Sequence, residues 1–147
     1  MNQLNPVDLL LVEDNPHDGE LIVRALRKRN LANRLFVVED GAEALDFIFH
    51  RGKFAQREAT PHPKVVLLDI KLPKVNGLEV LRAIKSDAQT RAMPVVMVTS
   101  SEQDPDIQTA YELGANSYVV KPVEFDAFQE VMIQLGFYWL LVNRPIK

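Results

Sequence analysis

The chain contains no cysteine, which excludes disulfide bonds and metal sites built on thiolates. It also has no excess of basic residues, because 17 Lys and Arg stand against 20 Asp and Glu, for a formal net charge of -3. A duplex-binding protein needs clustered positive charge, so we expect no nucleic-acid partner. No apolar run reaches the roughly 20 residues that span a bilayer, and the start MNQLNPVD lacks the features of a signal peptide. We therefore expect a cytoplasmic protein without a membrane partner.

Glycine is scarce and scattered, with six residues and no phosphate loop of the form GxxxxGK, so a nucleotide-binding switch of that kind is excluded. The chain has 147 residues, of which 47% are hydrophobic, and this suffices for a sizeable core. No linker or internal repeat interrupts the sequence. We predict a single domain over residues 1–147.

Short apolar runs alternate with segments in which apolar residues recur at helical spacing. The predicted strands are residues 7–12, 35–38, 65–68, 95–98 and 118–120. A helical pattern follows each strand, and the last predicted helix covers residues 125–136. Alternating strands and helices favour parallel pairing with right-handed crossovers. The predicted fold is α/β, with five parallel strands in the order 2-1-3-4-5 and helices on both faces.

Two segments exceed this minimal pattern. The connection at residues 50–64 is longer than the usual loop of about 4 to 6 residues, and long loops are either functional or mobile. The tail at residues 137–147 is aromatic and apolar where a solvated terminus is normally polar.

Polar residues follow four of the predicted strands. Glu13 and Asp14 end the first strand, Asp69 the third, Thr99 the fourth, and Lys121 the fifth. The carboxyl ends of parallel strands meet at one edge of the sheet, where ligands bind near the switch point of strand order. We therefore expect these side chains to converge. The second strand also ends in acids, but its edge position excludes them from the site.

Converging carboxylates repel one another, at about 3 kcal/mol for a pair roughly 5 Å apart at an effective dielectric near 20. A cation must therefore be present, and oxygen ligands without His or Cys suit Mg²⁺. We predict Asp14 and Asp69 as direct ligands, Glu13 as a ligand through water, and the backbone carbonyl of Lys71 as a further ligand. Together with Thr99 and Lys121, these groups provide what phosphoryl transfer requires.

Each residue also has a purely structural interpretation. Glu13 and Asp14 can cap the loop before a helix, and Thr99 can be a capping hydroxyl. Lys121 can be a solvated loop cation. The specificity lies in the combination of an acidic pair, an acid, a hydroxyl and a lysine at four strand ends.

These residues stand in motifs that resemble the receiver domain of two-component response regulators. The motifs are LVEDN (residues 11–15), LLDIKLPKVNG (67–77), VMVTSS (96–101) and YVVKPV (118–123). The resemblance covers about residues 5–135 and implies a (βα)5 flavodoxin-like fold. It implies Asp69 as phosphoacceptor, Glu13 and Asp14 as Mg²⁺ acids, Thr99 and Lys121 as phosphoryl-contacting residues, and Tyr118 as the switch aromatic.

The resemblance further implies a phosphodonor and an output. A sensor histidine kinase would phosphorylate Asp69, and the added charge would change a surface that contacts another protein. The long loop and aromatic tail are most similar to small stand-alone regulators paired with cyanobacterial phytochromes. On this interpretation the chain is not an enzyme, although it would assist its own phosphorylation and dephosphorylation with Mg²⁺.

Two rivals use similar residues. A haloacid-dehalogenase-type phosphatase needs a second acid two residues after the nucleophile, where this chain has Lys71. A pseudo-receiver, folded but not phosphorylated, is the stronger rival because fold does not determine function.

The tail also predicts a partner. Phe137, Tyr138, Trp139 and Leu140 belong to an apolar run of six residues, and a helix packed on one side buries only about half of such a run. Monomers rarely expose large apolar patches. We predict a homodimer through the last helix and the tail; the alternative is a tail that folds back over its own helix.

Overall fold

The structure is a computed structural model that describes residues 7–31, 34–57 and 62–146. Five parallel strands form one sheet in the order β2-β1-β3-β4-β5, as the sequence predicts. The strands are β1 Leu9–Val12, β2 Leu35–Val38, β3 Val65–Leu68, β4 Val95–Thr99 and β5 Ser117–Val120. In this order β1 and β3 lie inside the sheet, whereas β2 and β5 form its edges.

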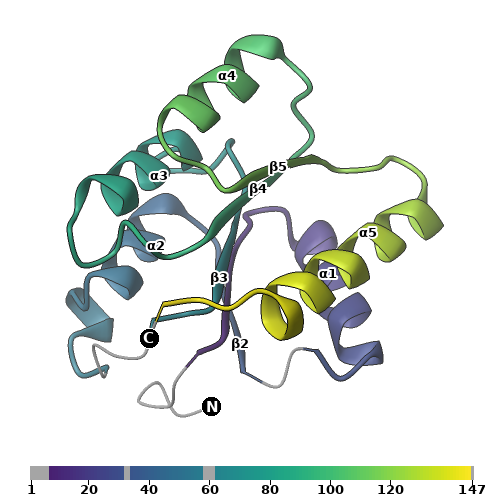
Figure 1. Ribbon diagram of the computed structural model, residues 1–147, viewed down its shortest axis with the longest axis horizontal. Coiled ribbons are helices and arrows are strands. Elements are labelled where there is room, and N and C mark those ends of the chain that lie inside the picture. The colour runs from purple at the N-terminus through teal and green to yellow at the C-terminus, as the bar shows by residue number, and fades with distance from the viewer. Residues whose placement is uncertain (1–6, 32–33, 58–61, 147) are drawn as a thin grey trace.

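Helices connect the strands and cover both faces of the sheet (Figure 1). They are α1 Pro16–Lys28, α2 Gly41–Ile48, α3 Gly77–Ser86, α4 Asp104–Glu112 and α5 Phe125–Phe137, with a 3-10 turn η1 Gly52–Phe54 and a π-helical segment η2 Tyr138–Val142. Helices α1 and α5 pack together on one face. Within the described ranges, no helix combines the length and the apolar character needed to cross a bilayer.

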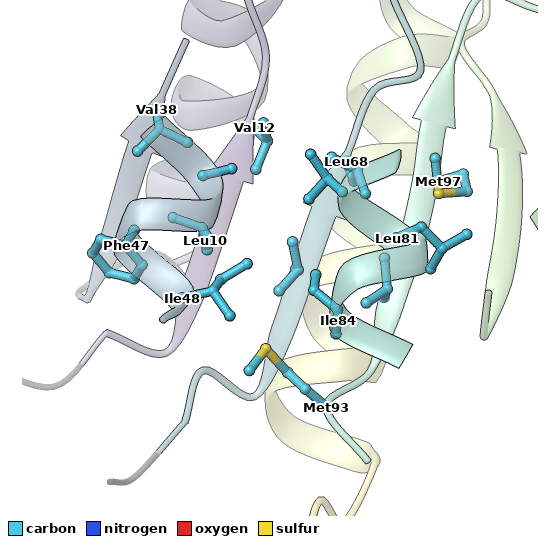
Figure 2. Packing of buried hydrophobic residues seen from close by; sticks show 14 of the residues in the cluster. Leu10, Val12, Val38, Phe47, Ile48, Leu68, Leu81, Ile84, Met93 and Met97 are labelled. Carbon is cyan, nitrogen blue, oxygen red and sulfur yellow. The ribbon is translucent and has the colours of Figure 1, made fainter. Parts of the chain in front are cut away.

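Alternate residues of the inner strands supply two hydrophobic clusters, because successive side chains of a strand point to opposite faces. In β3, Val66 and Leu68 belong to the cluster that includes residues of α2 and α3 (Figure 2). Val65 and Leu67 belong to the cluster that includes residues of α1 and α5. A strand buried on both faces must be continuously apolar, which explains the run before Asp69.

The strand ends differ from the prediction by one or two residues. β1 begins at Leu9 rather than at residue 7, although Asp8 already donates its N–H to the carbonyl of Arg34 at 2.8 Å. β5 begins one residue earlier than predicted, at Ser117. β4 extends to Thr99, so that this residue closes the strand rather than following it.

The described part of the long loop is packed against the core. Phe54 of η1 is fully buried and makes edge-to-face contacts with Phe36 and Phe47. The guanidinium of Arg57 lies 3.6 Å from the ring centre of Phe47 and donates to its carbonyl oxygen at 2.6 Å. Residues 58–61 of the predicted loop lie outside the described part of the chain.

The tail continues the last helix. Helix α5 reaches Phe137, one residue further than predicted, and η2 follows directly. Asn143 donates its N–H to the carbonyl of Tyr138 at 2.7 Å, and this five-residue spacing defines a π turn. Gly136 permits close packing of α5 on α1, because a side chain there would overlap Leu26.

This geometry divides the four residues predicted for a dimer interface. Leu140 is buried in the cluster of α1 and α5, and Trp139 is half-buried against the same cluster. Phe137 and Tyr138 are exposed, at 55% and 47% of their surface. Leu140 therefore belongs to the chain's own core and contributes no interface surface, while Phe137 and Tyr138 remain accessible.

Candidate functional site

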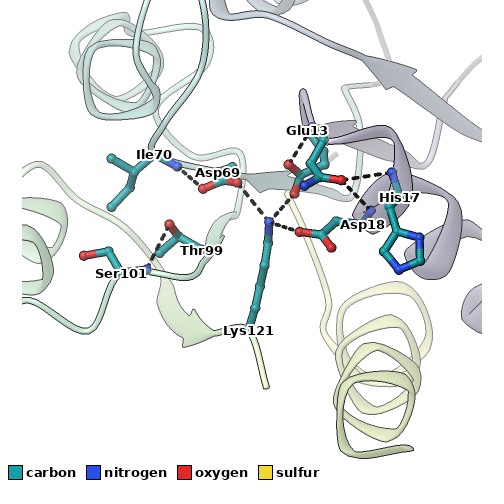
Figure 3. A network of polar contacts seen from close by, with 9 residues as sticks. Glu13, His17, Asp18, Asp69, Ile70, Thr99, Ser101 and Lys121 are labelled. Atoms are coloured by element: carbon teal, nitrogen blue, oxygen red, sulfur yellow. Dashed lines mark hydrogen bonds and ion pairs between the residues drawn. The ribbon is translucent and has the colours of Figure 1, made fainter. Parts of the chain in front are cut away.

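The carboxyl ends of β1, β3 and β5 bring predicted site residues together (Figure 3). Val12 and Leu68 are opposite each other at the ends of β1 and β3, so that Glu13 and Asp69 follow at neighbouring positions. The N–H of Asp69 donates to the carbonyl of Val12 at 3.1 Å and extends the ladder by one bond. Lys121 follows β5, and its side chain reaches the same point. The predicted convergence is therefore present.

Lys121 lies at the centre of this group. Its Nζ atom is 2.6 Å from Oε1 of Glu13, 2.9 Å from Oδ2 of Asp18 and 3.0 Å from Oδ2 of Asp69, and its side chain is only 8% exposed. An ammonium group has three N–H donors, and each has a carboxylate acceptor here. Lys121 is thus not the solvated loop cation of the structural alternative.

Asn15 positions the carboxylates on the α1 side of Lys121. It is the N-cap of α1, and its Oδ1 atom accepts from the N–H groups of His17 at 2.9 Å and Asp18 at 3.0 Å. Such a cap satisfies backbone donors that a helix start leaves free. The N–H of Asn15 also donates to Oε2 of Glu13 at 3.2 Å. One residue therefore holds both Glu13 and Asp18.

The backbone on the other side of Asp69 is equally constrained. The Oδ1 atom of Asp69 accepts from the N–H of Ile70 at 2.7 Å, and the carbonyl of Ile70 accepts from the N–H of Gly77 at 2.7 Å. A Cβ atom at Gly77 would overlap the carbonyl oxygen of Asp69. Only glycine allows the start of α3 to pack this closely against the phosphoacceptor candidate.

Burial changes the pKa values of the group. Burial raises the pKa of Glu13 from 4.5 to about 7, and the charge of Asp69 acts in the same direction while Lys121 opposes it. Burial alone would lower the pKa of Lys121, but its bonds to Glu13, Asp18 and Asp69 outweigh burial and raise it. Lys121 is therefore charged at neutral pH.

Three of the carboxylates form a group that suits a metal ion. Glu13, Asp14 and Asp69 each offer an oxygen atom, and these oxygens lie within 4.8 Å of one another. The donors are all hard oxygens, which fits a divalent cation such as Mg²⁺. They line an open pocket of about 440 Å³ together with Lys71 and Lys121. Lys71 is exposed, and its backbone carbonyl remains a predicted ligand.

Thr99, the last residue of β4, and Tyr118, the second residue of β5, both contact the loop that follows β4. Thr99 is buried, and its Oγ1 accepts from the N–H of Ser101 at 3.4 Å. The hydroxyl of Tyr118 donates to the carbonyl of Ser101 at 3.0 Å, and burial raises the pKa of this hydroxyl. Both predicted residues therefore contact the same loop residue, which in turn donates its Oγ to Asp106 at 2.6 Å.

The second strand's acids do not join the site. Asp40 is the N-cap of α2, and its Oδ1 accepts from the N–H of Glu43 at 2.7 Å. Asp40 thus has its own capping role, whereas Asp18 and Ser101, which the sequence pattern does not single out, contact Lys121 and Tyr118. Asp18 stands three residues after the cap Asn15, where acids are common for helix-dipole reasons, so its spacing did not distinguish it.

The chain is similar to proteins of one known family. The family model of the response regulator receiver domain matches residues 9–133. The chain belongs to this family. It is 40% identical over 141 residues to the probable methanogenesis regulatory protein FilR2 of Methanothrix harundinacea, covering 95% of this chain and 88% of the relative. It is 33% identical over 135 residues to the response regulator Rcp1 of Synechocystis, covering 92% and 90%.

Solved structures agree with this assignment. The Mn²⁺-bound form of Rcp1 superimposes with a TM-score of 0.89 at 30% identity, covering 97% of this chain and all of that one. The phosphorylated cyanobacterial phytochrome response regulator RcpA gives 0.89 at 31% identity, with the same coverage. The bacteriophytochrome response regulator RtBRR gives 0.76 at 49% identity, covering 97% of this chain and 85% of that one.

The family assignment confirms the predicted fold and the similarity to phytochrome response regulators. Receiver domains are phosphoacceptors of two-component systems rather than enzymes in the ordinary sense. The acidic group of Glu13, Asp14 and Asp69 offers the oxygen donors that suit a divalent metal ion.

Proposed function

We propose that this receiver accepts a phosphoryl group on Asp69 from a sensor histidine kinase and then signals through protein contact. The main support is the position of the Asp69 carboxylate, which is buried between the Ile70 N–H and Lys121 and beside two further carboxylates. A nucleophile in such a place has donors ready for the charge of an incoming phosphoryl group.

The proposed transfer is a substitution at phosphorus. A carboxylate oxygen of Asp69 forms the new P–O bond while the P–N bond of the donor phosphohistidine breaks, and the imidazole nitrogen keeps the bonding electrons and takes up a proton. Lys121 and the Thr99 hydroxyl donate to phosphoryl oxygens and so stabilise their charge. Mg²⁺, held by Glu13, Asp14, Asp69 and the Lys71 carbonyl, supplies further charge neutralisation when bound.

The proposed response begins with these same donors. The phosphoryl group adds charge next to Asp69, and Thr99 and Lys121 turn toward it. Tyr118 then changes its contact with Ser101, which links it to the start of α4 through Asp106. Helix α4 has a single fully buried residue, Ala110, so it is weakly anchored and suited to shift. The proposed signalling surface consists of α4, β5 and α5.

A phytochrome is the kinase class that the comparisons favour. RcpA is a cyanobacterial phytochrome response regulator and RtBRR is a bacteriophytochrome response regulator, and RtBRR is 49% identical to this chain. FilR2 is instead described as a probable methanogenesis regulator. The test is to compare the initial rates of phosphotransfer to this receiver from a bacteriophytochrome kinase and from an unrelated histidine kinase. We expect the bacteriophytochrome to be the faster donor.

The proposal of a stand-alone regulator is supported by the coverage of two relatives. The chain spans 88% of FilR2 and 90% of Rcp1.

The pseudo-receiver alternative makes the opposite prediction for phosphorylation itself. Incubation with acetyl phosphate and Mg²⁺, followed by intact mass spectrometry, should show one added phosphoryl group on the native chain and none on Asp69→Asn. A native chain that gains no mass would favour an interaction module that is not phosphorylated.

We further propose that the receiver forms a homodimer through α5 and η2. Phe137, Tyr138, Leu141 and Val142 are all exposed on these consecutive segments. Aromatic residues are enriched at interfaces, and contiguous apolar surface is costly to leave in water. Leu141, at 62% exposure, joins the predicted surface in place of the buried Leu140.

A further inference from the structure

Asp18 contacts Lys121, but it is not one of the predicted metal-binding, phosphoacceptor, phosphoryl-contacting or switch residues. Its Oδ2 atom lies 2.9 Å from Nζ of Lys121, and its side chain is 25% exposed, against 2% for Glu13 and 10% for Asp69. It is also absent from the group of Glu13, Asp14 and Asp69 that can hold a cation. Among the described residues, three carboxylates contact Lys121, and Asp18 is the one of them outside the candidate metal group (Figure 3).

The other two partners of Lys121 have competing roles. Glu13 and Asp69 can contact either the ammonium group or a divalent cation, so the ammonium and the metal compete for their charge. The more firmly Lys121 holds these two carboxylates, the weaker the binding of the metal. A third carboxylate outside the metal group reduces this competition, because it takes one of the three N–H donors.

Asp18 is also held in its position by the backbone. Its N–H donates to Oδ1 of Asn15, the cap that also binds Glu13 through its own N–H. Asp18 lies in the first turn of α1, so the ammonium is held toward a fixed helix end rather than toward a mobile loop.

We infer that Asp18 is a positioning residue that holds the ammonium of Lys121 on the α1 side of the site and thereby lets Mg²⁺ bind to Glu13, Asp14 and Asp69. The inference deepens the proposed phosphoacceptor function and rests on it for its biological use. Loss of Asp18 leaves Lys121 with only the two carboxylates that the metal needs, so Mg²⁺ should bind more weakly.

The test is a double-mutant cycle read by NMR titration of backbone amide shifts with MgCl₂ at constant ionic strength. Asp18→Asn should raise the Mg²⁺ dissociation constant about fivefold, a typical coupling for residues in contact. The same substitution in a Lys121→Ala background should change it less than about twofold, because Asp18 then has no ammonium to hold. Asp18→Glu should restore part of the affinity.

Glu20→Gln is the matched control, because it removes the same charge from the same helix at a side chain that is 62% exposed and paired with Arg24. It should leave the dissociation constant unchanged. An equal loss from Asp18→Asn in both backgrounds would overturn the inference, since Asp18 would then act on the metal by charge alone. An unchanged constant in the native background would overturn it as well.

Phosphorylation by acetyl phosphate separates this inference from the proposed function. If Asp18 and Lys121 are coupled in Mg²⁺ binding but the native chain gains no phosphoryl group, the proposed function is contradicted and the role of Asp18 is supported. If the native chain is phosphorylated but Asp18 and Lys121 are not coupled in Mg²⁺ binding, the proposed function is supported and the role of Asp18 is overturned.

Discussion

The Nζ atom of Lys121 lies 3.0 Å from Oδ2 of Asp69, although 52 positions separate the two residues in the chain. The same ammonium also binds Glu13 at 2.6 Å. One buried cation thus compensates two of the carboxylates that a metal ion would use. When a metal ion binds, Glu13 and Asp69 must therefore give up contacts with Lys121 in favour of the metal. The affinity for the metal should then be sensitive to a change in any of these three residues.

The affinity for Mg²⁺ should depend on pH near neutrality. Burial raises the pKa of Glu13 to about 7, so that this carboxylate is protonated in part below that pH. A protonated acid offers the metal no charge, and metal binding must then release the proton. We expect the Mg²⁺ dissociation constant to rise about tenfold from pH 8 to pH 6, as measured by NMR titration.

Glu13→Gln provides the control for this pH dependence. It should weaken Mg²⁺ binding at pH 8 and remove most of the change between pH 8 and pH 6. A native affinity that stays constant over this range would contradict the role of burial at Glu13.

Gly77→Ala should disturb Asp69 directly. A Cβ atom at Gly77 would overlap the carbonyl oxygen of Asp69, and relieving this overlap requires the backbone of the site to shift. We expect the free energy of unfolding to fall by about 2 kcal/mol or more, measured by urea denaturation. Phosphorylation by acetyl phosphate should slow in the fraction that remains folded.

Gly19→Ala is the matched control for a glycine near the same site. A Cβ atom there would meet only Cγ of Glu13 at 3.8 Å, an ordinary contact. Because alanine favours helices, this variant should be about 0.5–1 kcal/mol more stable than the native chain. If the two substitutions change the free energy of unfolding equally, the close contact between Gly77 and Asp69 is not what makes Gly77 necessary.

Lys71 is expected to weaken Mg²⁺ binding and to prolong the aspartyl phosphate. Its side chain is exposed beside Asp69 at the rim of the pocket, where a flexible cation competes with the metal and crowds an attacking water. Lys71→Asn should bind Mg²⁺ more tightly and lose its phosphoryl group faster. Lys74→Asn removes the same charge from the same loop outside the pocket and should do neither. Unchanged affinity and lifetime in Lys71→Asn would leave this residue without a role.

The sequence predicts those site residues whose position depends on strand order alone. Glu13 and Asp69 follow paired strands, so their convergence comes directly from the parallel sheet. Asp18 could not be predicted in the same way, because its contact depends on how α1 rotates and packs against the sheet. The bonds of Ser101 to Tyr118 and Asp106 likewise depend on a loop conformation that no periodicity encodes.

The tail illustrates the same limit. Its apolar character is evident from the sequence, but the assignment of inner and outer residues depends on the helical period. Leu140 follows the buried Met132 and Gly136 at the four-residue spacing of a helix, and the bond from Asn143 to Tyr138 then closes the tail with a five-residue turn. A continuous run of apolar residues offers no polar position that would mark which side is buried.

The exposed residues of the tail lead to a prediction about assembly. Leu141→Glu places a charge at a side chain that is 62% exposed on η2, so the dimer should dissociate while the circular dichroism of the fold is retained. Tyr111→Glu, at a 50% exposed apolar residue of α4, is the control and should leave the dimer intact. Light scattering that finds a native monomer at high concentration would contradict the proposed dimer.

In the proposed function, Asp69 itself forms the acyl phosphate. The most direct measurement is borohydride reduction of the chain after treatment with acetyl phosphate and Mg²⁺, because reduction converts a phosphorylated aspartate to homoserine at its own position. Peptide mass spectrometry should then find homoserine at position 69 and aspartate at position 14. Homoserine at Asp14 or at any other acid, or none in a chain whose Mg²⁺ binding is intact, would contradict the assignment of Asp69 as the phosphoacceptor.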